Sequence, residues 1–208
     1  MNAASTLLPW AGDVGATLVR LLAGVAVAIA LGWPLGILLG RKVRLWRWIE
    51  PSVELVRAVP PALAFPLALL LLGYGELARV TTVTFGTVAL FVVHVAGALE
   101  RAPAARRDIV ALAGVRGIDA IRVLDVHESM PALLLALRLA LAQGLIIAVV
   151  GEMLVGTRHG LGARAMDALV AYDVADLMVV LVVSGLLGAG LSTIVAALER
   201  RFVSWARD

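Results

Sequence analysis

Residues 21–40 read LLAGVAVAIALGWPLGILLG, a stretch in which no side chain is charged. The hydrocarbon core of a membrane is about 30 Å thick, and about 20 helical residues cross it. The stretch therefore predicts a membrane-spanning helix. Four more long apolar runs follow along the chain. Together the runs predict five spans, at about residues 17–40, 58–75, 80–99, 129–152 and 177–198.

The composition agrees with a membrane protein. Of the 208 residues, 62% are hydrophobic and 16% are charged, and the mean hydropathy is +0.98. Soluble domains are about half apolar and about a quarter charged. The runs are apolar at consecutive positions rather than alternate ones, which favours helices over the strands of a barrel. We therefore expect one all-α integral membrane domain over residues 1–208, with five transmembrane helices.

Several function classes are disfavoured by what the sequence lacks. The chain has no cysteine, which excludes disulfides, thiolate metal sites and a cysteine nucleophile. Its three histidines are too scattered for an H-E-x-x-H zinc site, and neither a G-x-x-x-x-G-K-[ST] loop for ATP nor a G-x-S-x-G elbow occurs. The net charge of +3 gives no reason to expect nucleic-acid binding. We expect no catalytic residue, no metal and no cofactor, and hence not an enzyme.

The basic residues predict the orientation, because short cytoplasmic loops retain Lys and Arg. Most of them lie in three segments, residues 41–57, residues 101–122 and the end of the chain after residue 198. These segments are therefore expected on the cytoplasmic side. The N-terminus is then outside and the C-terminus inside.

Small residues recur at every fourth position of the first span. They are Gly24, Ala28, Gly32, Gly36 and Gly40. Such a face lets two helices approach closely in a membrane. A similar face occurs in the last span, at Ser184, Gly188 and Ser192. Each face predicts a contact with another helix, although glycine is also common in membrane helices for other reasons.

The connection between the third and fourth spans, residues 100–128, is too charged to be membrane and too long for a simple turn. It reads as two short helical pieces, 107–113 and 118–126, separated by glycines at positions 114 and 117. The second piece has one apolar side. This pattern indicates docking to a cytoplasmic partner or to the membrane surface, and a solvated loop without a partner is the alternative.

Four polar residues in the spans are candidates for a translocation path or gate, because ionisable groups at membrane depth are costly and usually face a cavity. They are Arg138, Gln143, Glu152 and His94. Arg138 is suited to neutralising an anionic solute, or it extends to the lipid headgroups. His94 is better explained by a hydrogen bond within the bundle, and an interfacial contact explains Glu152 as well as a gate does.

Residues 108–114, DIVALAG, occupy the frame of a known cytoplasmic loop, E-A-A-x-x-x-G. This loop resembles that of the membrane permease subunits of ATP-binding-cassette (ABC) importers of the nitrate/sulfonate/taurine type. Other motifs that resemble this type occur in order along residues 17–205: WPLGILLG at 33–40, RAVPP at 57–61, GYGEL at 73–77, LRLAL at 137–141, EML at 152–154, GLG at 160–162 and LERR at 198–201.

The resemblance implies a set of partners. A separate ATPase subunit would bind the loop 100–128, called the coupling loop below. The residues implied in this contact are Asp108, Ala113, Gly114, Arg116, Ile118 and Ile121. A second permease copy, identical or not, would complete the path, and an extracytoplasmic solute-binding protein would deliver the solute. The expected location is the plasma membrane of a prokaryote, with the chain in the lipid bilayer and without nucleic acid.

The coupling loop departs from the family pattern. Asp108 replaces the glutamate, Ile109 and Val110 replace the two alanines, and His127 stands where a proline is expected. Three functions therefore remain open. The leading hypothesis is an importer of a small anion such as an aliphatic sulfonate, taurine or nitrate. The alternatives are an importer of quaternary amines and a permease-like membrane scaffold that does not transport.

Overall fold

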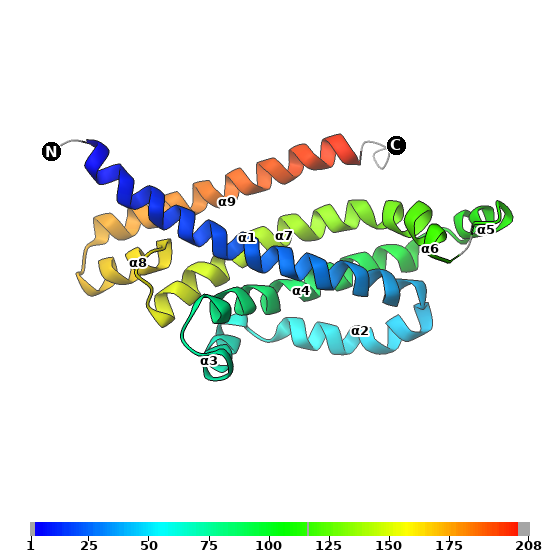
Figure 1. The fold of residues 1–208 in the computed structure, drawn as a ribbon, viewed down its shortest axis with the longest axis horizontal. Helices are drawn as coiled ribbons and strands as arrows, with labels where there is room; N and C mark the ends of the chain where they lie inside the picture. Colours follow the sequence, from blue (N-terminus) through cyan, green and yellow to red (C-terminus); the bar gives the residue numbers. More distant parts are fainter. Residues whose placement is uncertain (1–2, 116, 204–208) are drawn as a thin grey trace.

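The computed structural model describes residues 3–115 and 117–203, and within these ranges all the regular structure is helical (Figure 1). The helices are α1 (Ala3–Arg41), α2 (Val43–Ala58), α3 (Pro61–Leu72), α4 (Glu76–Arg101), α5 (Ala104–Leu112), α6 (Gly117–Ala120), the π-helical turn η1 (Ile121–Asp125), α7 (Val126–Val155), α8 (Leu161–Val170) and α9 (Val174–Phe202). The all-α fold predicted from the sequence is confirmed.

Four segments in the described ranges are long and apolar enough to cross a membrane. They are Trp10–Arg41, Glu76–Arg101, Gly117–Val155 and Val174–Phe202. A fifth crossing requires a pair of helices, Val43–Ala58 and Leu63–Leu72, that meet at an angle of 91°. The structure therefore has four spans, or five if the bent pair counts as one.

The segment predicted as the second span, residues 58–75, is not one straight helix. Helix α3 has 12 residues, which is too few to cross a bilayer core. The chain breaks at Pro60 and Pro61, because proline has no backbone N–H and keeps the preceding residue out of the α conformation. Helix α2 runs back along α4 before this break (Figure 1).

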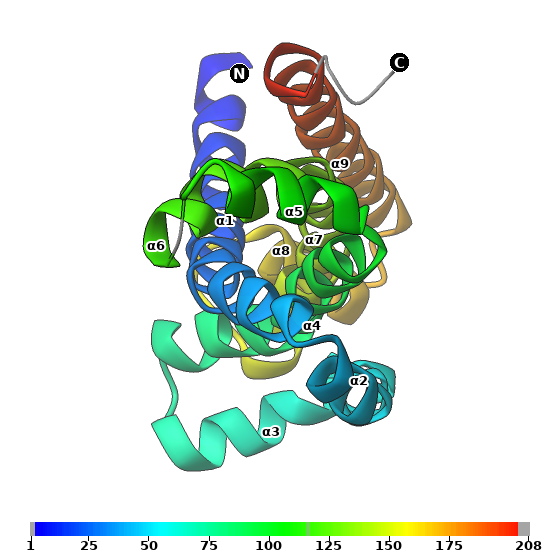
Figure 2. The same ribbon diagram turned by 90° about the vertical axis from the view of Figure 1, so that its right-hand side faces the viewer.

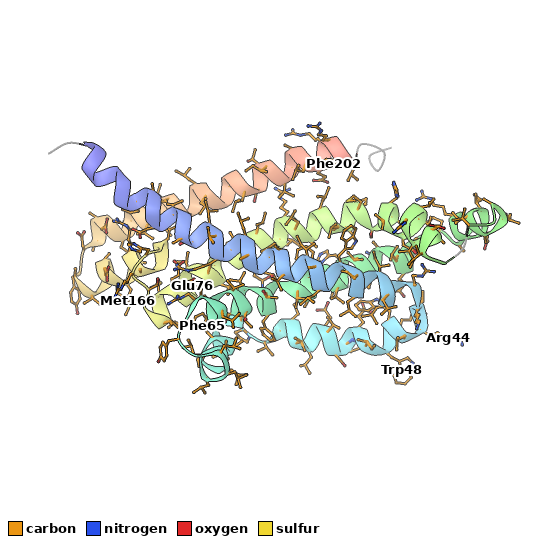
Figure 3. The ribbon with its side chains drawn as sticks, viewed as in Figure 1. Arg44, Trp48, Phe65, Glu76, Met166 and Phe202 are labelled. Atoms are coloured by element: carbon orange, nitrogen blue, oxygen red, sulfur yellow. The ribbon has the colours of Figure 1, made fainter. Side chains whose placement is uncertain are left out.

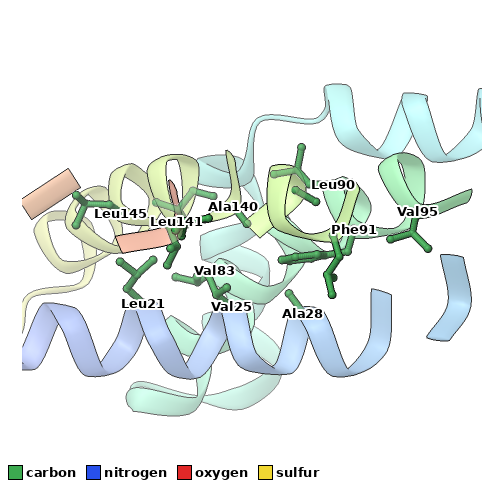
Figure 4. Close-up of a cluster of buried hydrophobic side chains, with 14 of the residues drawn as sticks. Leu21, Val25, Ala28, Val83, Leu90, Phe91, Val95, Ala140, Leu141 and Leu145 are labelled. Carbon is green, nitrogen blue, oxygen red and sulfur yellow. The ribbon is translucent and has the colours of Figure 1, made fainter. Parts of the chain in front are cut away.

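Helix α4 is the centre of the bundle, with α1 and α7 packed against it (Figure 2). The largest buried apolar cluster joins these three helices. Its members include Leu21, Val25 and Ala28 from α1, Val83, Leu90, Phe91 and Val95 from α4, and Ala140, Leu141 and Leu145 from α7 (Figure 4). Only 11% of the apolar part of α9 is buried in this chain. Helix α9 therefore presents most of its apolar surface outward.

The small-residue face of α1 packs against α4, as predicted. A Cβ atom added to Gly36 would lie 2.8 Å from Val95 Cβ, and one added to Gly40 would lie 2.9 Å from the backbone of Ala96. These distances are too short for any side chain. In α9, by contrast, a Cβ added to Gly188 would meet only Leu145 at an ordinary 3.5 Å. At Gly188, the glycine of the face predicted in the last span, α9 therefore makes no comparably close approach to any other described helix.

The two ends of the bundle carry different segments of the chain. One end carries the coupling loop and the end of α9, and the other carries α8 and the loop between α3 and α4 (Figure 1). We call them the inner and outer ends, following the orientation predicted by the basic residues.

Candidate functional site

The coupling loop projects from the inner end of the bundle (Figure 1). Helix α5 carries two large apolar side chains that are open to solvent, Ile109 at 64% and Leu112 at 87% exposure. Gly114 and Gly117 both have positive φ angles, +76° and +63°, a conformation that other residues adopt only with strain. These two glycines turn the chain between α5 and α6.

Most of the residues predicted for coupling lie on the surface of this loop. Asp108, Ala113, Gly114 and Ile118 are all exposed. Ile121 differs, because its side chain is half-buried and packs against the main apolar cluster. Arg116 lies outside the described residues. Ile109 and Leu112 were not among the residues predicted for coupling, although two large apolar side chains in a charged loop were a usable signal.

One ion pair connects the coupling loop to α1, and a second joins its helix α5 to the first turn of α7. Arg41 at the inner end of α1 donates from Nη1 to Asp125 Oδ2 at 2.7 Å, and Arg106 of α5 pairs with Glu128 of α7. The turn η1 also continues directly into α7. The loop is therefore attached to both α1 and α7.

The outer end contains a cluster of charged and polar side chains, which we call the outer polar cluster: the buried Asp13, Thr17, Arg20 and Glu152, the partly buried Arg164 and the exposed Glu76. Glu152 at the end of α7 is fully buried. Arg20 Nη1 donates to Glu152 Oε1 at 2.6 Å, and Thr17 Oγ1 lies 2.9 and 3.0 Å from the two carboxylate oxygens. The predicted gate residue Glu152 therefore does not line an open path within this chain.

Arg20 also binds Glu76, the first residue of α4. Figure 3 labels Glu76 near α8. Arg20 Nε donates to Glu76 Oε2 at 2.6 Å, and Arg20 Nη2 donates to Glu76 Oε1 at 2.8 Å. Arg79, one turn along α4, holds the same carboxylate at 2.7 Å. The outer ends of α1, α4 and α7 are thus joined through one guanidinium.

Asp13 forms the second half of the cluster, on the side of α8. Its carboxylate accepts the backbone N–H of Gly160 at 3.0 Å and pairs with Arg164 of α8. The guanidinium of Arg164 lies 4.2 Å from the centre of the Trp10 ring, a cation–π contact. Neither Asp13 nor Arg20 was a candidate from the sequence.

The other predicted path residues lie apart from this cluster. Arg138 is exposed on α7, and among the described residues its guanidinium has no hydrogen-bond or ion-pair partner. Gln143 donates from Nε2 to Gly86 O at 3.1 Å and lines a cavity of about 160 Å³ between α3, α4 and α7. His94 Nδ1 lies 2.8 Å from Leu90 O on its own helix, which satisfies that ring nitrogen within α4.

Comparison with known proteins decides the family. Residues 28–208 match the family described as binding-protein-dependent transport system inner membrane component. The chain belongs to this family. Members of the family are the membrane permease subunits of ABC importers, and they do not themselves hydrolyse ATP. This permease is accordingly a multi-pass protein of the inner membrane that works with a solute-binding protein and an ATPase.

Similar permeases support the same assignment. A probable ABC transporter permease of Brucella melitensis is 32% identical over 197 residues, which cover 93% of this chain and 78% of that one. The taurine transport system permease TauC of Escherichia coli is 28% identical, with 92% and 70% covered. The putative aliphatic sulfonates transport permease SsuC of Bacillus subtilis is 26% identical, with 93% and 70% covered.

The fold of this permease is also found in a solved importer. An inward-facing structure of the MetNI methionine ABC transporter contains a chain that superposes with a TM-score of 0.83. The match covers 97% of this permease and 99% of that chain, at 19% sequence identity. This likeness shows the shared fold.

Proposed function

We propose that this permease lines the path of a small anion, such as an aliphatic sulfonate, taurine or nitrate, and couples to its ATPase through α5. The coupling half of the proposal rests on the exposed apolar side chains of α5. Ile109 and Leu112 lie beyond the inner end of the bundle and are exposed. Apolar surface is unfavourable in the water that surrounds this part of the chain. Docking in a groove of the ATPase subunit removes this surface from water.

A test of coupling substitutes the most exposed of these side chains. Burying a leucine contributes about 1.5–3 kcal/mol, so Leu112→Ser is expected to weaken ATPase binding by roughly ten-fold or more. The measurement is the amount of ATPase that co-purifies with the tagged permease in mild detergent. Tyr74→Ser is the matched control, because Tyr74 is equally exposed, at 84%, but at the outer end. Absence of any ATPase from the wild-type complex would favour the scaffold alternative instead.

The path half of the proposal is supported by one face of α7. Residues spaced three and four apart on a helix share a face, and the exposed ones here are Leu135, Arg138, Leu139, Ala142 and Ile146. Towards the outer end this face reaches the cavity that Gln143 and Ile146 line. An unpartnered arginine near the middle of a span is costly in lipid, which favours a water-filled path or a second permease subunit opposite this face.

The chemistry of Arg138 supports an anionic solute. A guanidinium presents paired N–H groups that match planar or tetrahedral oxyanions better than a lysine does. Two of the relatives above are named for taurine and aliphatic sulfonates, which both carry a sulfonate group. No similar observation favours a quaternary amine, for which an exposed arginine would be repulsive.

Uptake into cells or proteoliposomes tests the role of Arg138 with taurine, ethanesulfonate and nitrate as the solutes. We expect Arg138→Gln to lower uptake at least ten-fold while the complex with the ATPase stays intact. Arg138→Lys keeps the charge and should retain part of the activity. If Arg138→Gln transports as well as the wild type, Arg138 extends to the lipid headgroups and the path assignment is wrong.

A further inference from the structure

The first three backbone N–H groups at the start of α8 are all bound by side chains from other helices. The first N–H groups of any helix have no partner inside that helix, and a nearby side chain usually accepts them. Helix α8 follows Gly160, which has no side chain to do so. Gly160 N donates to Asp13 at 3.0 Å, Leu161 N to Thr17 Oγ1 at 2.9 Å, and Gly162 N to Glu152 Oε2 at 2.9 Å.

This arrangement needs both glycines of the GLG motif. A Cβ atom on Gly162 would lie 2.1 Å from Val149 O, and one on Gly160 would lie 2.4 Å from Glu152 Oε2. Gly160 also has a φ of +145°, which side-chain-bearing residues rarely adopt. The backbone at the start of α8 is therefore placed directly against the end of α7, where the carboxylate of Glu152 reaches it.

Glu152 is the central member of this attachment. It is the one acceptor that α7 supplies, and it also binds Thr17 and Arg20 of α1. Removing its charge does not leave Arg20 unpaired, because Glu76 holds that guanidinium through two hydrogen bonds. Helix α8 also keeps an apolar attachment, since Leu161 and Ala165 pack with Val180 of α9. Loss of the Glu152 carboxylate should therefore loosen the start of α8 without unfolding the bundle.

We propose that Glu152 is a positioning residue for transport. Its carboxylate fixes the start of α8 to α1 and α7, so that a displacement of α8 by a docked binding protein also displaces both spans. The far end of α8 offers a docking surface, because Leu169 and Val170 are exposed there. This inference rests on the proposed function, because it concerns how a transporting permease responds to the solute-binding protein with which its family works.

The variant Glu152→Gln tests whether this role depends on the carboxylate or only on the size of the side chain. Glutamine has the same size, but its amide has one acceptor oxygen and a donor NH₂ group. Arg20 and Gly162 both present donors to this side chain, so the amide oxygen satisfies only one of them. Glu76→Gln is the matched control. It also takes a carboxylate from Arg20, but Glu76 makes no hydrogen bond to α8.

The experiment uses the purified complex of permease and ATPase in lipid nanodiscs. Its ATP hydrolysis is titrated with the binding protein, loaded with whichever of taurine, ethanesulfonate or nitrate the wild type transports. For Glu152→Gln we expect basal hydrolysis within two-fold of the wild type, and a rise of about ten-fold in the binding-protein concentration for half-maximal stimulation. Hydrogen exchange at residues 160–162 should be at least ten-fold faster. Glu76→Gln should match the wild type in both measurements.

Each outcome has a distinct meaning. Stimulation of Glu152→Gln equal to that of Glu76→Gln overturns the inference. A wild-type complex that its loaded binding protein does not stimulate overturns the proposed function, whatever the variant does. If Glu152→Gln fails to assemble, Glu152→Asp carries the test, since it keeps the negative charge but its shorter side chain withdraws the carboxylate from Gly162 N. A shift of less than two-fold in Glu152→Asp would then overturn the inference.

Discussion

Arg20 has every N–H group of its guanidinium bound. Five hydrogen bonds leave it, to the carboxylates of Glu76 and Glu152, the backbone oxygen of His159 and the hydroxyl of Thr157. An arginine has five such donors, so none is left for solvent. This saturation explains how a charged residue is tolerated at 7% exposure near the end of a span.

Replacing Arg20 should lower the stability of the permease far more than replacing its buried partner Glu152. Arg20→Met leaves the carboxylate of Glu152 buried without a counter-charge, which typically costs about 3–5 kcal/mol. The double variant Arg20→Met with Glu152→Gln removes both charges and should recover at least half of the lost stability. Thermal unfolding in detergent, followed by size-exclusion chromatography, measures this. Simple addition of the two single effects would show that the pair is not coupled.

The sequence could not have predicted these contacts. Arg20 was visible as a charge at the edge of the first span, but its partners lie 56 and 132 residues further along the chain. No local spacing connects positions so distant. Glu152 was selected because a charged residue next to a glycine-rich turn is unusual in a span. Its burial depends on how α1 and α8 fold over it, which a single sequence does not encode in any local pattern.

At the scale of elements, the contact between α1 and α4 depends on glycine. Backbone and side chains of α4 occupy the space where the side chains of Gly24, Gly32, Gly36 and Gly40 would lie. The period of this face could be predicted from sequence because it follows the helical repeat. The similar face in α9 shows the limit of such patterns, since the repeat predicts a close contact but does not identify the helix that makes it.

A large residue in this face should separate the two helices. Gly36→Leu places a side chain where Val95 and the backbone of Val92 already lie. Overpacking costs about 1–3 kcal/mol or more, so the melting temperature should fall by about 5 °C. Gly185→Leu in α9 is the control, because nothing lies within 4 Å of a Cβ at that position. Equal melting temperatures for the two variants would contradict the importance of the α1–α4 contact.

The break between α2 and α3 is an element that the sequence analysis missed. The run 58–75 was counted as a span because it is uncharged, apolar and long enough to cross a membrane as a helix. Its two prolines at positions 60 and 61 end the preceding helix, and the next helix leaves at 91°. Hydropathy averages over a window and so does not register a single missing donor.

At the scale of the whole molecule, the orientation remains a prediction from the basic residues. The absence of cysteine makes it directly testable, because any cysteine introduced is the only thiol in the chain. Tyr74→Cys places a thiol at an exposed site just before α4, at the outer end. Leu112→Cys places one at an exposed site in α5, at the inner end. A membrane-impermeant maleimide should label Tyr74→Cys in intact cells, and Leu112→Cys only after the membrane is opened. The reverse pattern would invert the orientation.

The attachment of α8 also has a consequence for the order in which the permease is made. Asp13 and Thr17 leave the ribosome early, whereas the N–H groups that they accept arrive nearly 150 residues later. Arg20, by contrast, meets Glu76 as soon as α4 has inserted, long before Glu152 is synthesised. The charge of Arg20 is therefore compensated first by Glu76 alone, and in the complete bundle by Glu76 and Glu152 together. The outer end closes only when α7 and α8 have joined the growing bundle.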